Sequence, residues 1–203
     1  MRTVTKNSGP DASARGPRRP AQAGFTLLEM VVAMVVLMVG LLALASAVGY
    51  ALNVTNSGRN VTNTKLLIVS VLEQMENLRN TKELTFGQIA NTGSVDNTGA
   101  TTNFVGFQTG FQSVSKSPGP DGMYGTADDL TNPGPDGVYG TSDDFTDQSL
   151  ARTGYQRQIA ITSLSSTLKR IEVTIQYPGG DGRTRTLQGV SYLDDDAHNN
   201  FLR

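Results

Sequence analysis

GFTLLE, residues 24–29, opens the segment that decides how this chain folds. It runs directly into an uncharged stretch that extends from Met30 to Asn53. As a helix, the 23 residues from 30 to 52 would be about 35 Å long, enough to cross a hydrocarbon core of about 30 Å. A carboxylate at the start of such a segment costs about 2.5–3.5 kcal/mol on insertion scales. Glu29 therefore predicts a charged partner and a function.

The residues before this stretch form a short basic segment. Residues 1–24 carry five Lys or Arg side chains against one acid, Asp11, whereas the whole chain has a net charge of −1. A basic segment next to a membrane-spanning helix is typically kept in the cytoplasm. Prolines among Gly, Ser and Arg predict that it has no regular structure. We expect no nucleic-acid binding from it, because charge blocks are common in leader segments.

The composition argues against an enzyme. The absence of cysteine excludes disulfides, thiolate catalysis and cysteine-ligated zinc. The single histidine, His198, lies in the C-terminal tail, where we expect a solvated chain end. No serine stands in a nucleophile motif, so the sequence offers no catalytic constellation.

Helical spacing resumes after the apolar segment. Ile68, Leu72, Met75 and Leu78 recur at intervals of four and three residues, which indicates an amphipathic helix. We predict one long helix over residues 25–80, with Gly58 as a point at which it can bend. Residues 25–53 would face lipid, and residues 54–80 would pack on a globular head.

The rest of the chain predicts a small antiparallel sheet. Residues 170–177 alternate apolar and polar side chains, the pattern of a half-buried strand. The region 150–203 is expected to hold strands at 155–162, 170–177 and 183–193, with a turn at 178–182 and a bulge at Gly189. Residues 81–117 are rich in Gly, Thr and Asn and predict loop with at most a short strand or helical turn. The fold class is therefore α+β, a long helix covering a meander.

Residues 118–147 contain an internal repeat with a period of 15 residues. PDGMYGTADD, the first copy (residues 120–129), recurs as PDGVYGTSDD, the second copy (residues 135–144). Calcium takes six to eight oxygen ligands from a tightly folded chain, although the spacing here is not that of an EF-hand. The predicted calcium ligands are Asp121, Asp128 and Asp129 in the first copy and Asp136, Asp143 and Asp144 in the second. The alternative is a pair of solvated turns, for which Pro-Asp-Gly is also typical.

The opening motif and the apolar run that follows it, residues 19–52, resemble the N-terminal signature of type IV pilins and type II secretion pseudopilins. The predicted helix and meander are similar to that family more loosely. The run VGLLALA, residues 39–45, is similar to minor pilins of the PilV kind.

This resemblance implies a processing site. A prepilin peptidase would cut between Gly24 and Phe25 on the cytoplasmic face, and the same enzyme would N-methylate Phe25. Glu29 matches the family's glutamate, which is implicated in methylation and subunit docking. A terminal amine and a carboxylate that pair in hydrocarbon remove much of the cost that each bears alone. In a filament, Glu29 would pair with a neighbouring subunit's amine and so set the axial register.

The resemblance also implies partners and a location. The partners would be other pilin or pseudopilin subunits, the processing enzyme, an inner-membrane assembly platform and, before assembly, membrane lipid. The chain would cross the inner membrane once with its head outside the cytoplasm, and then enter a pilus at the cell surface or a pseudopilus in the periplasm.

Three departures and several alternatives stand beside this interpretation. The leader is long, the apolar segment lacks the proline of many major pilins, and no cysteine pair is present; the last two favour a minor subunit. The alternatives are a type II secretion pseudopilin, a membrane-anchored calcium-dependent adhesin, and a plain membrane anchor. A DNA-uptake pilin has no electrostatic support from the acidic head.

Overall fold

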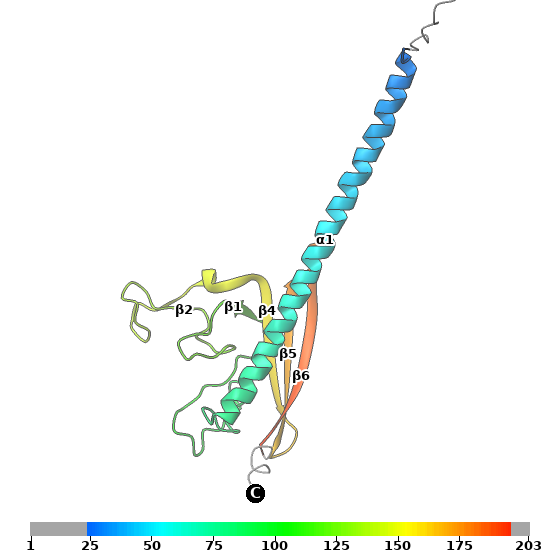
Figure 1. The fold of residues 1–203 in the computed structure, drawn as a ribbon. Coiled ribbons are helices and arrows are strands. Elements are labelled where there is room, and N and C mark those ends of the chain that lie inside the picture. The colour runs from blue at the N-terminus through cyan, green and yellow to red at the C-terminus, as the bar shows by residue number, and fades with distance from the viewer. Residues whose placement is uncertain (1–23, 196–203) are drawn as a thin grey trace, which may run out of the picture. The chain divides into compact units, whose positions relative to one another are not determined.

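The computed structural model describes residues 24–195, so the predictions for residues 1–23 and for His198 lie outside the described residues. The chain divides into two compact units at Ala47–Val48. One helix, α1 (Leu27–Asn80), accounts for the first unit's described structure and continues into the second (Figure 1). It is assigned without a break through Gly58, close to the predicted bounds of 25–80.

The apolar first half of α1 has its side chains exposed, including Leu37, Leu41 and Leu44. By length and composition, α1 is the one helix in the described part of the chain that could cross a membrane. Exposed aliphatic side chains on every face of a helix match a lipid or helix-bundle environment rather than water.

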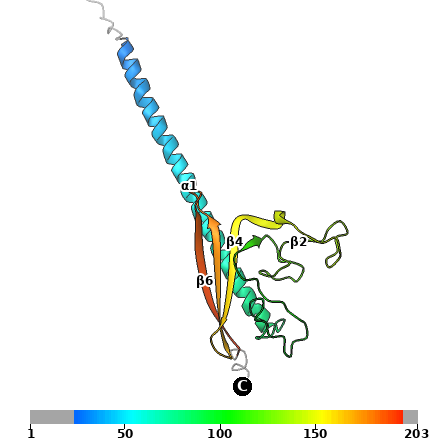
Figure 2. The ribbon, with the colours of Figure 1, turned by 180° about the vertical axis from the view of Figure 1, so that it is seen from behind.

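The second unit contains the predicted antiparallel meander and a further edge strand. The main sheet has the order β1-β4-β5-β6, with β1 at Gln112–Ser115, β4 at Ala151–Ser163, β5 at Leu168–Pro178 and β6 at Thr184–Asp194 (labelled in Figure 1; Figure 2 shows β4 and β6 from behind). A two-stranded pair joins β2 (Thr131–Asn132) to β3 (Phe145–Thr146), and a 3-10 turn, η1 (Gln148–Leu150), leads into β4. The three predicted strands are thus confirmed, and β1 is the short strand expected within 81–117.

The core lies between the second half of α1 and the sheet. Ile68, Met75 and Leu78 are buried, as the helical spacing predicts, while Leu72 is only partly buried. Val71 takes the central position that the spacing does not single out. These side chains meet the inward residues of the sheet, Ile159, Ile171, Val173, Ile175 and Leu193. Removal of this apolar area from water is the main stabilising term for the head.

The predicted bulge at Gly189 is wrong. The register between β5 and β6 runs without a shift, with Val173 opposite Gly189. Gly189 instead lies under α1, where an added Cβ would come within 2.3 Å of Ile68 Cγ2. Close approach of a helix is the second reason for a glycine within a strand, and the sequence alone does not distinguish the two.

The polar segment after the apolar half of α1 also has a structural role. Asn53 Nδ2 donates to the Gly180 carbonyl at 2.9 Å, and Asn60 Nδ2 donates to the Pro178 carbonyl at 2.8 Å. The hydroxyl of Ser57 accepts from the Gly180 N–H at 3.2 Å. This face of α1 therefore holds the β5–β6 turn by hydrogen bonds to its backbone.

Candidate functional site

The N-terminal motif lies at the start of α1. Gly24, Phe25 and Thr26 precede the helix and lie outside regular secondary structure, and the Phe25 side chain is 79% exposed. The Thr26 hydroxyl accepts from the Glu29 N–H at 3.3 Å, so Thr26 caps the helix. A Gly–Phe junction outside regular structure is accessible to a peptidase.

Glu29 also lies at a position where an acid stabilises the start of a helix. Residues 26–29, Thr-Leu-Leu-Glu, have the spacing of a capping box, in which an acid occupies the third helical position. Glu29 is the acid in the first turn of α1 and is exposed. A carboxylate there also offsets the positive end of the helix dipole. The T-x-x-E spacing is the signal in the sequence for this role.

The first copy of the repeat folds as a closed loop. The Asp121 N–H donates to Asp128 Oδ2 at 3.1 Å, and the Thr126 hydroxyl donates to Asp128 Oδ1 at 2.7 Å. Asp129 Oδ2 accepts from the Gly125 N–H at 2.9 Å. The carboxylates therefore serve to close the turns, as Asp does in Asx-type turns.

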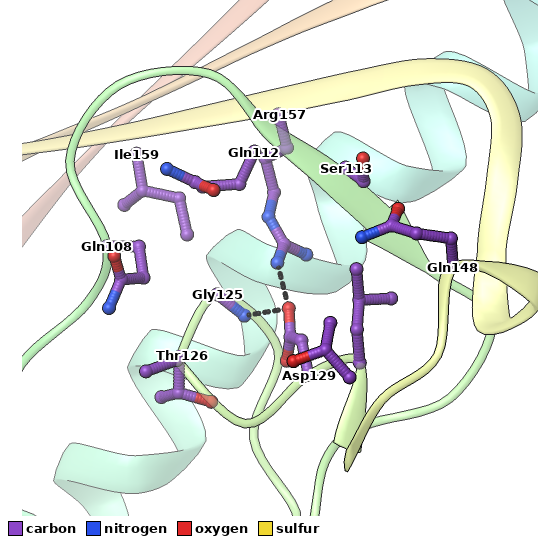
Figure 3. A pocket seen from close by; sticks show the side chains of 12 residues that line it. Gln108, Gln112, Ser113, Gly125, Thr126, Asp129, Gln148, Arg157 and Ile159 are labelled. Atoms are coloured by element: carbon purple, nitrogen blue, oxygen red, sulfur yellow. Dashed lines mark hydrogen bonds and ion pairs between the residues drawn. The ribbon is translucent and has the colours of Figure 1, made fainter. Parts of the chain in front are cut away.

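The first copy is also packed against the head, and we call this copy seated because its residues contact β4 and α1. Asp129 Oδ2 accepts from Arg157 Nη2 at 2.6 Å, and the side chains are 8% and 3% exposed (Figure 3). Gly125 has φ +97°, and an added Cβ would lie 2.4 Å from Ile159 Cδ1. The side chain of Gln74 accepts from the Tyr124 N–H at 2.9 Å and donates to its carbonyl at 3.1 Å.

Burial dominates the electrostatics of this ion pair. It raises the pKa of Asp129, and the Arg157 charge offsets only part of that effect. It also lowers the pKa of Arg157, with Asp129 acting in the opposite direction. Asp129 Oδ1 is buried and has no hydrogen-bond partner among residues 24–195. Such a pair contributes little net stability while intact, but breaking it leaves an uncompensated buried charge.

A polar pocket of about 220 Å³ adjoins the ion pair. Figure 3 shows the glutamines Gln108, Gln112 and Gln148 around it, with Arg157 and Asp129 between them. Its volume lies below the range of about 300–1,000 Å³ typical of small-molecule sites. We assign it no ligand.

The second copy has the same internal hydrogen bonds, but it is not packed against the sheet. The Thr141 hydroxyl donates to Asp143 Oδ1 at 2.5 Å, and Asp144 Oδ2 accepts from the Gly140 N–H at 2.8 Å. Val138 is 55% exposed, whereas the equivalent Met123 is 8% exposed. An added Cβ at Gly140 would meet nothing within 4 Å. Figure 1 shows this loop, which links β2 and β3, extending away from the sheet.

The six predicted calcium ligands do not gather into a metal centre. Within residues 24–195 no group of three or more acidic or histidine side chains is close enough to hold a metal ion. In the first copy, Asp129 is paired with Arg157, which leaves fewer free carboxylates for a cation. In the second copy, Asp136, Asp143 and Asp144 form no ion pair with a basic side chain of residues 24–195, and calcium binding by the repeat stays a proposal.

Comparison with protein families assigns the N-terminal segment. A family described as "Prokaryotic N-terminal methylation motif" matches residues 19–45, a range that includes Gly24, Phe25 and Glu29. The chain carries the prokaryotic N-terminal methylation motif. This motif is the prepilin signal of type IV pilin-like proteins, which are generally structural and not enzymatic. No curated protein and no solved structure matches the chain.

The matched motif and the apolar helix are features of the N-terminal segment of type IV pilins and pseudopilins. They indicate processing by a prepilin peptidase, anchoring in a membrane and assembly with other pilins. The matched range ends before the head begins, so the motif says nothing of the repeat.

Proposed function

We propose that the chain is a minor type IV pilin, a structural subunit that acts in assembly or initiation of a pilus. The methylation motif over residues 19–45 carries this proposal. The exposed apolar half of α1 supports it, because such a helix suits both a bilayer and the helical core of a filament. The absence of a mid-segment proline and of cysteine favours a minor subunit over the bulk one.

In this proposal the ends of the motif have separate roles. Cleavage after Gly24 frees the amine of Phe25, which is then methylated. Glu29 pairs with the terminal amine of a neighbouring subunit when the helix leaves the lipid. The pairing fixes the axial stagger, because a displaced neighbour would leave both charges unpaired in an apolar surrounding.

The test is the intact mass of the protein isolated from its native host. We expect loss of residues 1–24 and the gain of one methyl group. An unprocessed N-terminus would contradict the proposal. A Glu29→Ala variant should still be cleaved and should enter filaments poorly, while a Glu73→Ala variant, altered on the second half of α1, serves as the matched control.

A type II secretion pseudopilin is the competing proposal within the same family. A deletion strain separates the two: loss of surface pili with normal protein secretion supports the pilus, and the reverse supports the secretion system.

A membrane-anchored, calcium-dependent adhesin is the proposal from another class. In that case the exposed second copy is a better candidate for a calcium site than the first copy, which is buried against the sheet.

A further inference from the structure

We propose that the second copy of the repeat (residues 135–144) is a docking element for another protein subunit that presents an arginine on a β-strand. The first copy shows what this motif binds. It makes its contacts outside the loop through four features: the last Asp, the glycine at its sixth position, the backbone of the tyrosine before that glycine, and the buried side chain of Met123. The second copy keeps the first three as Asp144, Gly140 and Tyr139, and it has another apolar residue, Val138, in place of Met123.

The surface that receives the first copy is specific in its chemistry. Arg157 and Ile159 lie two residues apart on β4, so they point to the same face of the sheet. The arginine pairs with the Asp carboxylate, and the isoleucine fills the space that the glycine leaves open. The N–H of Gln108 donates to the Gly125 carbonyl at 2.7 Å and completes the contact.

The second copy presents the same features without a receiving surface. The two loops share their internal hydrogen bonds, so the second copy is already folded in the binding conformation. Pre-organised loops bind without a large ordering cost. Tyr139 is 50% exposed and Phe145, which follows the copy, is 52% exposed. Tyr and Phe side chains are enriched in protein–protein interfaces.

Charge indicates what surface the partner presents, and the structure argues against this chain itself as the partner. The segment 131–147 contains four Asp and no Lys or Arg, so it complements a basic surface. The equivalent surface on this chain, around Arg157, is filled by the first copy. The partner is therefore a different protein. The inference rests on the proposed function only in taking that protein to be another subunit of the assembly.

The experiment places a photoreactive side chain in the full-length protein in its native host. The variant Tyr139→p-benzoylphenylalanine is irradiated, and the adduct is mapped by mass spectrometry. The controls are the same substitution at Tyr124, the seated equivalent, and at Tyr192, which is exposed on β6. We expect an adduct from position 139 alone, with a partner strand that contains an arginine.

A second substitution separates the specific ion pair from net charge. Asp144→Asn should reduce the adduct about tenfold or more, because it removes the carboxylate that meets the arginine. Asp136→Asn removes the same charge, but its equivalent in the first copy, Asp121, does not touch Arg157, so the adduct should persist.

Three results would overturn the proposal: no adduct from position 139, equal loss in the two Asn variants, or an adduct with another copy of this chain. The intact mass of the same samples reports processing independently. A chain that is unprocessed yet forms the expected adduct would refute the pilin proposal and leave this one standing.

Discussion

The two copies of the repeat share eight of ten residues and fold alike, yet one is part of the core and the other is not. Met123 and Asp129 are buried in the first copy, whereas Val138 is exposed in the second. The local sequence therefore determines the shape of the loop, and the neighbouring strand determines its energetics. Equivalent substitutions in the two copies form matched pairs that test this difference.

The largest difference is expected at the last Asp of each copy. Asp129→Asn leaves Arg157 buried without its partner and should cost about 3–5 kcal/mol of the free energy of unfolding. Asp144→Asn should cost no more than about 0.5 kcal/mol, as at most surface positions. Urea unfolding of the full chain in detergent measures both. The double variant Asp129→Asn, Arg157→Met should recover much of the loss; no recovery would show that the charge is not the cause.

The glycines at the sixth position should differ by less. Both have positive φ, +97° at Gly125 and +87° at Gly140, so an alanine at either site costs about 1–2 kcal/mol. Only at Gly125 does the new Cβ collide with the buried Ile159, which adds about 1–3 kcal/mol. Thermal unfolding of the two Gly→Ala variants should show a lower Tm for Gly125→Ala. Equal Tm values would mean that the first copy is not seated.

The pH dependence of stability should change in opposite directions for Asp129 in the first copy and Asp143 in the second, which are not equivalent positions. Burial raises the folded pKa of Asp129, so its contribution is greatest below the unfolded value of about 3.9 and falls as pH rises through the folded pKa. Hydrogen bonding from Thr141 lowers the pKa of Asp143, whose contribution is present above that value and is lost as pH falls.

Unfolding measured between pH 3 and about 6 tests this expectation. Relative to the unmodified chain, Asp129→Asn should make stability rise more steeply with pH, and Asp143→Asn should make it rise less steeply. Slopes that change in the same direction would contradict the assigned environments.

Calcium should have the smallest effect, and only through the second copy. A calcium concentration equal to Kd would stabilise the folded chain by about 0.4 kcal/mol. We expect a small rise in Tm at millimolar calcium that Asp143→Asn abolishes and Asp128→Asn leaves in place. No rise, or equal loss in both variants, would end the calcium proposal for this repeat.

Much of the fold could be predicted from the sequence because its signals are local. The long helix follows from an uncharged run and from the spacing of Ile68, Met75 and Leu78, and β5 follows from strict alternation. The processing motif is likewise a contiguous string, residues 24–29, and the family match covers it. The bulge at Gly189 was wrong because a glycine reports only that space is needed, not whether a bulge or α1 needs it.

By itself, the sequence determined the elements, the α+β class, the membrane-competent helix and the closed loops of the repeat, since each depends on neighbours within a few turns or residues. Only the tertiary structure decided that Asp129 meets Arg157, 28 residues away, and that Asp144 meets no arginine within the described part of the chain. The physical reason is that two nearly identical loops have the same local energies. Which of the two loops becomes buried depends on whether the rest of the chain places a strand with a complementary charge against it.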